Sequence, residues 1–143
     1  MMFWDASAII PLCIDEPQTK VLREAAKKTG TMAVWWGSLI ECCSAFARLR
    51  RDGQLKQKEE DEVRHILSIL SSSWIEIEPC EEVRTMAGNL LLLHPLRAAD
   101  SLQLAAALVW AKKSPKGHQF VCLDRKLGEA ARKAGFKVMP AAA

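Results

Sequence analysis

Four acidic residues have the types and positions that metal-dependent hydrolysis requires. Asp5 and Asp124 follow short apolar segments, whereas Glu41 and Asp100 fall in the first turns of predicted helices. Carboxylate oxygens without His or Cys favour hard cations such as Mg²⁺ or Mn²⁺. One such cation activates a water for attack on phosphorus, and a second stabilises the leaving oxygen. The pattern therefore indicates hydrolysis of phosphodiester bonds by metal-activated water held by four carboxylates.

Each acid also has a purely structural explanation. Asp124 fits a helix N-cap, Asp5 the cap of a turn, and Asp100 a favourable charge near a helix N-terminus. Ser38 and Glu41 fit a capping box. A cap contributes about 1 kcal/mol, however, whereas two like charges about 4 Å apart repel by about 4 kcal/mol at an effective dielectric constant of about 20. Four clustered acids would therefore need a cation to neutralise them.

The elements that must position these acids alternate along the chain. Apolar spacing predicts strands over residues 3–4, 31–35, 74–78, 120–123 and 136–139, and helices over residues 18–29, 38–52, 54–70, 81–92, 98–113 and 125–134. Strands separated by helices form a mostly parallel sheet with both faces covered. Strand ends and helix starts share one edge of such a sheet, so we expect the four acids to meet there.

The composition is that of one globular domain. The chain has 143 residues, of which 50% are hydrophobic and 26% charged, which excludes disorder as the main state. Five cysteines without a C-x-x-C spacing favour free thiols in a reducing cytoplasm over a zinc site or a disulfide framework. Asp5 interrupts the apolar N-terminal stretch, and no apolar run approaches the roughly 20 residues of a membrane span. We therefore expect a cytoplasmic protein without a membrane partner.

The segments that carry the acids resemble a known family. Residues 3–9 (FWDASAI), Glu41 within a helix, residues 96–105 (LRAADSLQLA) and residues 120–127 (FVCLDRKL) are similar to PIN domains, above all to the VapC toxins of type II toxin–antitoxin systems. The resemblance implies a PIN-like three-layer α/β/α sandwich with a central, mostly parallel sheet of four or five strands. It places a single nuclease domain over residues 1–140, followed by a tail over 141–143. It also implies a Mg²⁺- or Mn²⁺-dependent endoribonuclease, usually a homodimer, that a cognate antitoxin inhibits.

The resemblance also implies roles for individual residues. Asp5, Glu41, Asp100 and Asp124 match the acidic quartet of the family, with Asp5 and Asp100 as direct metal ligands. Glu41 and Asp124 would bind through water or hold a second metal. Ser7 matches the hydroxyl residue that supports the first aspartate. In three places the chain departs from the family pattern: Cys122 replaces the usual Thr or Ser, Gln103 replaces a frequent His, and Trp4 is bulkier than the usual aliphatic residue.

Basic residues near the acids are candidates for substrate binding. Arg97 and Arg125 lie close to Asp100 and Asp124 in sequence, so either could contact phosphate, although basic residues on helices often form only a solvated face. The pair Trp35–Trp36 would stack on an RNA base or pack in the core or a dimer interface. The formal net charge is +3; with four of the 17 acids set aside for metal, 13 acids oppose 20 basic residues, an excess suited to a polyanion.

Two other functions fit parts of the pattern. A non-catalytic RNA-binding or partner-binding module on the same fold would explain the altered residue Cys122. An aspartyl-phosphate phosphatase or receiver would use Asp5, but the phosphatase pattern needs a second acid at position 7, where this chain has Ser7. Attack by water does not require a 2′-hydroxyl, so the acids alone do not distinguish RNA from DNA.

Overall fold

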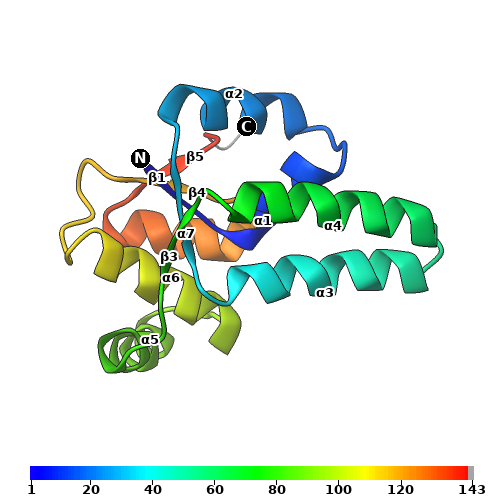
Figure 1. Cartoon of the computed structure of the whole chain (residues 1–143). Helices are drawn as coiled ribbons and strands as arrows, with labels where there is room; N and C mark the ends of the chain where they lie inside the picture. The colour runs from blue at the N-terminus through cyan, green and yellow to red at the C-terminus, as the bar shows by residue number, and fades with distance from the viewer. Residues whose placement is uncertain (142–143) are drawn as a thin grey trace.

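A parallel sheet forms the centre of the computed structural model, which describes residues 1–141 (Figure 1). Within these residues the sheet has five strands in the order β3-β2-β1-β4-β5, and every neighbouring pair is parallel. The strands are β1 (Met2–Trp4), β2 (Met32–Trp35), β3 (Ile75–Ile77), β4 (Gln119–Val121) and β5 (Lys137–Met139). The predicted α/β fold with four or five strands is therefore confirmed. Of the predicted tail, residues 142–143 lie outside the described residues.

Seven helices within the described residues cover the two faces of the sheet (Figure 1). They are α1 (Ala6–Cys13), α2 (Thr19–Thr29), α3 (Ser38–Arg51), α4 (Gln57–Ser71), α5 (Glu81–Leu93), α6 (Ala98–Trp110) and α7 (Arg125–Ala134). Helices α1 to α4 pack on one face and α5 to α7 on the other, which gives three layers. Across residues 1–141, none of the helices has the length and apolar character needed to cross a membrane.

The core lies on both sides of the sheet because strand residues alternate between its faces. Met2 and Trp4 pack against α1 to α4, whereas Phe3 between them packs against α5 to α7. All three side chains are buried. Two covered faces explain why the strands are almost wholly apolar, as expected for a parallel sheet.

Helix α1 is an element that the apolar pattern did not predict. Six of its eight residues are buried, so it has no polar face from which a helical period could be read. Helix α6 ends at Trp110, three residues before the predicted end, because Lys112 and Lys113 adopt positive φ angles of 54° and 61°. Helix α4 begins at Gln57, three residues later than predicted.

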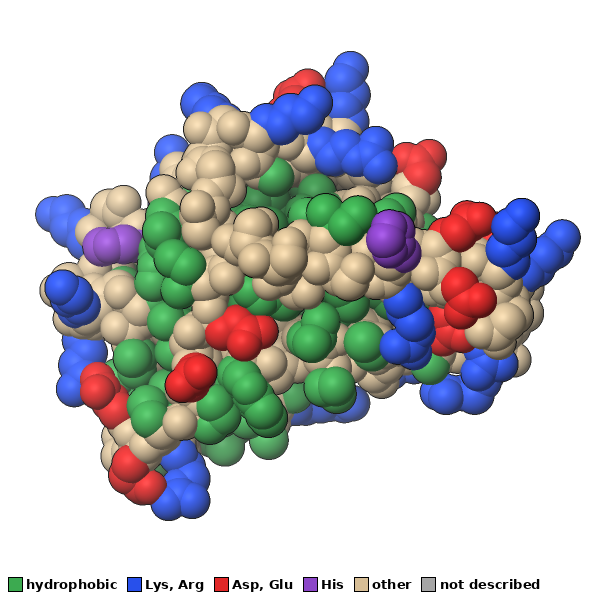
Figure 2. Space-filling model, viewed as in Figure 1, with side chains coloured by type: hydrophobic (Ala, Val, Ile, Leu, Met, Phe, Trp, Pro, Cys, Tyr) green, Lys and Arg blue, Asp and Glu red, His purple; other side chains and the backbone are tan. Residues whose placement is uncertain are grey.

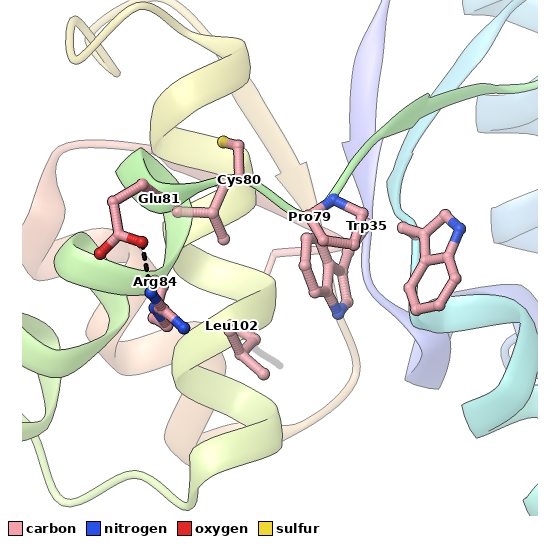
Figure 3. Close-up of a pocket in the computed structure, with 8 residues that line it drawn as sticks. Trp35, Pro79, Cys80, Glu81, Arg84 and Leu102 are labelled. Atoms are coloured by element: carbon pink, nitrogen blue, oxygen red, sulfur yellow. Dashed lines mark hydrogen bonds and ion pairs between the residues drawn. The ribbon is translucent and has the colours of Figure 1, made fainter.

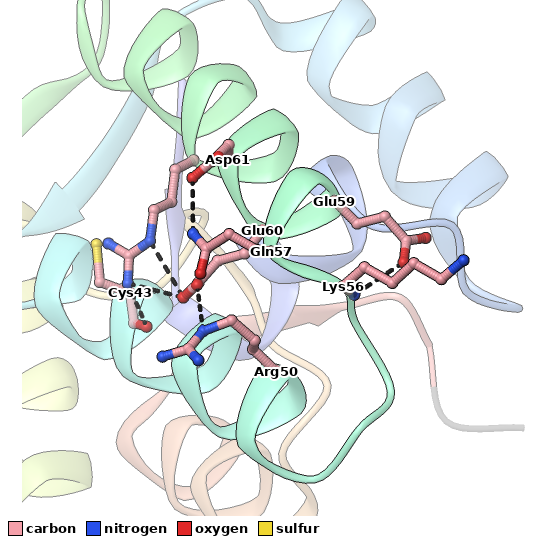
Figure 4. Close-up of polar contacts among 8 residues, drawn as sticks. Cys43, Arg50, Lys56, Gln57, Glu59, Glu60 and Asp61 are labelled. Atoms are coloured by element: carbon pink, nitrogen blue, oxygen red, sulfur yellow. Dashed lines mark hydrogen bonds and ion pairs between the residues drawn. The ribbon is translucent and has the colours of Figure 1, made fainter.

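Helices α3 and α4 form an antiparallel pair that extends away from the sheet (Figure 1). The buried carboxylate of Glu60 on α4 joins them, because it accepts hydrogen bonds from Arg50 Nε at 2.6 Å and Arg64 Nη2 at 3.2 Å (Figure 4). Burial alone would raise the pKa of Glu60, but the hydrogen bonds from Arg64 and Arg50 lower it. This cluster braces α3, the helix that carries Glu41.

The strand order reverses at β1, which lies between β2 and β4. In open parallel sheets, such a switch point leaves a crevice beyond the carboxyl ends of the strands. Asp5 directly follows β1, and Asp124 comes shortly after β4. The topology therefore places two of the four acids at the crevice.

Candidate active site

The end of β1 holds a deeply buried acid, Asp5, which is only 4% exposed. Its backbone N–H donates to Val121 O on β4 at 2.9 Å, which fixes the main chain at this point. Its side chain caps α1 by accepting from the Ser7 N–H at 3.2 Å, and it also accepts from the Ser7 hydroxyl. The capping explanation for Asp5 therefore holds, but capping does not require so complete a burial.

Ser7 connects the ends of β1 and β4. Its Oγ accepts hydrogen bonds from the Leu123 N–H at 2.9 Å and the Asp124 N–H at 3.2 Å, while its hydroxyl donates to Asp5. Cys122 supports the same carboxylate, because its Sγ lies 3.6 Å from Asp5 Oδ2. The residue at the usual Thr or Ser position thus still offers a donor, although a weak one.

Glu41 projects from the first turn of α3, but not as part of a capping box. Gly37 is the N-cap, and the buried Ser38 hydroxyl makes no capping hydrogen bond, so that structural explanation is wrong. Gln103 on α6 instead donates from Nε2 to Glu41 Oε1 at 3.1 Å and contacts Ser38 Oγ at 2.9 Å. The residue at the frequent His position therefore orients Glu41.

The remaining two acids come from the starts of α6 and α7. Asp124 caps α7, accepting from the Leu127 N–H at 2.9 Å, and it is exposed to solvent. Asp100 lies half-buried in the first turn of α6. The N-cap explanation thus applies to Asp124, and its second carboxylate oxygen is left free of that bond.

The four acids line a single pocket of about 430 Å³, together with Ser7 and a cation on α3, Arg48. A neighbouring hollow of about 760 Å³ shares two of these acids, Asp100 and Asp124. The cations of that second hollow are Arg97, Arg125 and Lys126. Residues from β1, α3, α6 and α7 thus meet at one edge of the sheet.

Burial and mutual repulsion raise the pKa values of three of these acids. Burial raises the pKa of Asp5 to about 6 against hydrogen bonds from Ser7, and the charge of Asp100 adds to the rise. Burial likewise raises the pKa of Glu41 to about 7, with a further contribution from the charge of Asp5. The pKa of Asp100 is raised by burial and by the charge of Asp124. The site therefore holds negative charge at a cost that a bound cation would remove.

The donor set of the pocket fits a hard divalent cation. Its four acids offer only carboxylate oxygens, and these suit Mg²⁺ or Mn²⁺ rather than Zn²⁺. Across residues 1–141, no three His, Cys, Asp or Glu side chains converge closely enough to form a ready metal cluster. The carboxylates surround the pocket, and binding would require them to turn towards a common point.

Arg48 is a site residue that sequence reasoning missed. It lies seven residues after Glu41 on α3, and at 3.6 residues per turn this spacing places both on one face of the helix. The spacing can be read from the sequence. It does not place Arg48 at the pocket, however, until the structure shows that Glu41 lines the pocket.

A third hollow, of about 460 Å³, lies beyond the ends of β2 and β3 (Figure 3). Trp35 and Pro79 lie on one side of it, and Glu81 pairs with Arg84 on the other. These are its only charged side chains among the described residues, and they neutralise each other. This hollow therefore has no excess of acidic side chains, unlike the pocket with the four acids. Trp35 is buried, which agrees with the prediction that it packs in the core. Its neighbour Trp36 is 53% exposed.

Comparisons with known proteins support the fold. No protein-family model matches the chain, and no curated protein matches it in sequence. The structure resembles VapBC2 from Rickettsia felis bound to a DNA fragment from their promoter, with a TM-score of 0.67 and 13% identity over 96% of this chain and 98% of that chain. It also resembles FitAcB from Neisseria gonorrhoeae (TM-score 0.65, 15% identity, 96% and 97% covered). A third likeness is to a toxin–antitoxin complex from Klebsiella pneumoniae (TM-score 0.60, 15% identity, 88% of each chain). The VapC-like fold expected from the acid-bearing segments is therefore confirmed.

Proposed function

We propose that this protein is a Mg²⁺- or Mn²⁺-dependent endoribonuclease of the VapC type, held inactive by a cognate antitoxin. The observation that carries the proposal is the meeting of Asp5, Glu41, Asp100 and Asp124 in one pocket at the carboxyl edge of the sheet. Caps account for two of these acids, but not for the burial of Asp5 or the pairing of Glu41 with Gln103. A metal site accounts for all four.

Each acid has a distinct role in this proposal. Asp5 and Asp100 hold the metal directly, while Glu41 and Asp124 bind it through water or hold a second ion. Ser7 and Cys122 keep Asp5 oriented, and Gln103 keeps Glu41 oriented. A bound divalent cation would lower the proton affinity of a water and offset charge at the phosphoryl oxygens.

The preference for RNA over DNA rests on the resemblance, whereas the basic surroundings of the acids suit the phosphates of either. Arg97 and Arg125 line the hollow that shares Asp100 and Asp124, where a phosphate of the substrate would lie. Phosphate contacts of this kind position a strand without selecting its sequence. We therefore propose RNA as the substrate, without a stated cleavage sequence.

The antitoxin and a second copy of the chain are the proposed partners. One structural neighbour is a toxin–antitoxin complex, which supports an antitoxin for this chain. Several large apolar side chains are exposed, above all Leu92 at 84%, Leu93 at 74% and Ile40 at 66%. Hydrophobic side chains gather in the lower half of the face shown in Figure 2. Exposed apolar surface of this kind commonly marks a protein interface, which supports the proposed homodimer. We also propose a cytoplasmic location.

A cleavage assay with purified protein tests the function. We expect cleavage of a mixed RNA substrate in Mg²⁺ or Mn²⁺, no cleavage in EDTA, and loss of cleavage in Asp100→Asn. The matched control is Asp52→Asn, which removes an acid at the exposed end of α3 outside the pocket. Cleavage that survives Asp100→Asn and EDTA would contradict the proposal. Binding of RNA without cleavage or metal uptake would instead support the non-catalytic module, and a matched DNA substrate tests the preference for RNA.

A further inference from the structure

The pocket with the four acids and the neighbouring hollow meet at Asp100 and Asp124, which line both. The two hollows adjoin at these acids, and we call them together the trough. Arg48 on α3 lines one arm of this trough. Arg97, Arg125 and Lys126 line the other arm. The acids therefore lie between cations from opposite layers of the sandwich.

Arg48 is available to bind an anion. Among residues 1–141 it takes part in no ion pair, although Arg50, two residues further along the helix, pairs with Glu60. It is exposed to solvent and is not part of the buried core. It also lies about 10 Å from Glu41 along the helix axis, given a rise of 1.5 Å per residue. Arg48 thus lines the acid pocket about two helical turns away from Glu41.

The second arm is also open to an anion. Arg125 pairs with Glu129 at 3.5 Å, but both side chains are more than half exposed, and such surface pairs contribute at most about 1 kcal/mol. Arg97 and Lys126 form no ion pair within the described residues. A phosphate could therefore replace Glu129 as the partner of Arg125 at little cost.

We infer that Arg48 is a phosphate-binding residue and that a single-stranded nucleic acid crosses the acid pocket with its backbone gripped on both sides. Arg48 holds one side of the strand, and Arg97, Arg125 and Lys126 hold the other. This inference rests on the proposed function and extends it, because it gives the direction in which the substrate lies across the acids. A backbone anchored at two points positions the intervening phosphate over the carboxylates.

Binding of a fluorescein-labelled oligouridylate, measured by fluorescence anisotropy over a range of salt concentrations, tests the inference. The measurement uses an Asp5→Asn background, so that cleavage does not disturb the equilibrium. In that background Arg48→Gln is compared with Arg48→Lys and with Arg51→Gln. Arg51 has the same charge and lies on the same helix, but it does not line the trough. Arg125→Gln probes the other arm, and circular dichroism checks that each variant is folded.

We expect Arg48→Gln to weaken binding about threefold to tenfold at low salt, as loss of one charged contact does. The slope of log K against log salt should fall by about 0.7, the value for one phosphate contact of a single strand. Arg48→Lys should restore that slope, Arg51→Gln should leave it unchanged, and Arg125→Gln should lower it independently of Arg48. An unchanged slope in Arg48→Gln, or an equal decrease of the slope in Arg51→Gln, would overturn this inference but not the proposed function. A parent that binds no oligouridylate at low salt would overturn the proposed function as well.

Discussion

Gln103 Nε2 on α6 donates a hydrogen bond to Glu41 Oε1 on α3 at 3.1 Å, which joins residues 62 positions apart in the chain. The Gln103 side chain is fully buried, whereas Glu41 is partly exposed at the pocket. The hydrogen bond lowers the pKa of Glu41 against the stronger effect of burial. Gln103 is therefore a positioning residue, since it acts on the site through Glu41.

We predict that Gln103→Ala moves the pH dependence of cleavage to higher pH. Without the hydrogen bond, the pKa of Glu41 in the metal-free protein should rise above its present value of about 7, so less carboxylate is available to bind metal near neutral pH. A profile of kcat/KM against pH measures the shift. Gln103→His, which keeps a donor, should restore part of the original profile. A uniform loss of activity at every pH would instead indicate a packing defect.

Replacing a site acid should stabilise the protein in the absence of metal. Asp5→Asn keeps an oxygen that can cap α1. It removes the carboxyl group, whose pKa is raised to about 6 by burial. We expect a gain of roughly 1–3 kcal/mol in EDTA near neutral pH, since each pKa unit corresponds to about 1.4 kcal/mol. Asp100→Asn should change stability in the same direction by less, because Asp100 is only half-buried. Thermal unfolding measures both, and a lower melting temperature would mean that the acids serve mainly as caps.

The metal-free protein should be more stable in mild acid than at neutral pH. Folding raises the pKa of Asp5 from 3.8 to about 6 and that of Glu41 from 4.5 to about 7. At pH values between the unfolded and folded pKa values, the folded state binds more protons than the unfolded state. The free energy of unfolding therefore falls as pH rises through this window. We expect the melting temperature in EDTA to be higher at about pH 5 than at about pH 7.5. Added Mn²⁺ should reduce the difference. A melting temperature that increases from about pH 5 to about pH 7.5 would contradict the claim that the buried carboxylates destabilise the metal-free protein.

Substitution of Cys122 should change the pKa of Asp5 in a predictable order. Burial raises the pKa of the thiol, so Cys122 stays a neutral donor beside Asp5. A hydroxyl is a stronger donor, so Cys122→Ser should lower the pKa of Asp5, whereas Cys122→Ala should raise it. Carboxyl carbon chemical shifts of Asp5, followed by NMR against pH, measure both changes. Identical titrations in the two variants would show that the contact with Cys122 has no effect.

The Glu60 cluster should affect stability but not the chemistry of the site. Glu60→Gln removes the charge that Arg50 and Arg64 share and leaves weaker hydrogen bonds between α3 and α4. We expect a lower melting temperature with cleavage retained below that temperature. The pKa of Glu60 is lowered in the folded state. In the wild-type protein, the contribution of this cluster to the free energy of unfolding should therefore be lost in acid and not in base. Loss of cleavage in a fully folded variant would instead show that the cluster controls the position of Glu41.

Much of the fold and the identity of the four acids could be predicted from the sequence. Strand residues such as Phe3 and Trp4 are apolar because both faces of a parallel sheet are covered, and that pattern is local. Gly30 and Gly135 end α2 and α7 with positive φ angles, which is again a property of neighbouring residues. Helix α1 could not be predicted in this way, because nearly every residue in it is buried and its apolar period is hidden.

The sequence by itself determined which side chains are available for chemistry and that strand ends and helix starts would bring acids to one edge of a parallel sheet. Only the tertiary structure decided how those acids are held. The contacts of Gln103 with Glu41 and of Cys122 with Asp5 join residues 62 and 117 positions apart. They depend on how α3, α6 and β4 pack, and no local pattern encodes that packing. The burial that raises the pKa of Asp5, and the place of Arg48 beside the acids, follow from the same packing, because burial and proximity are properties of the assembled layers.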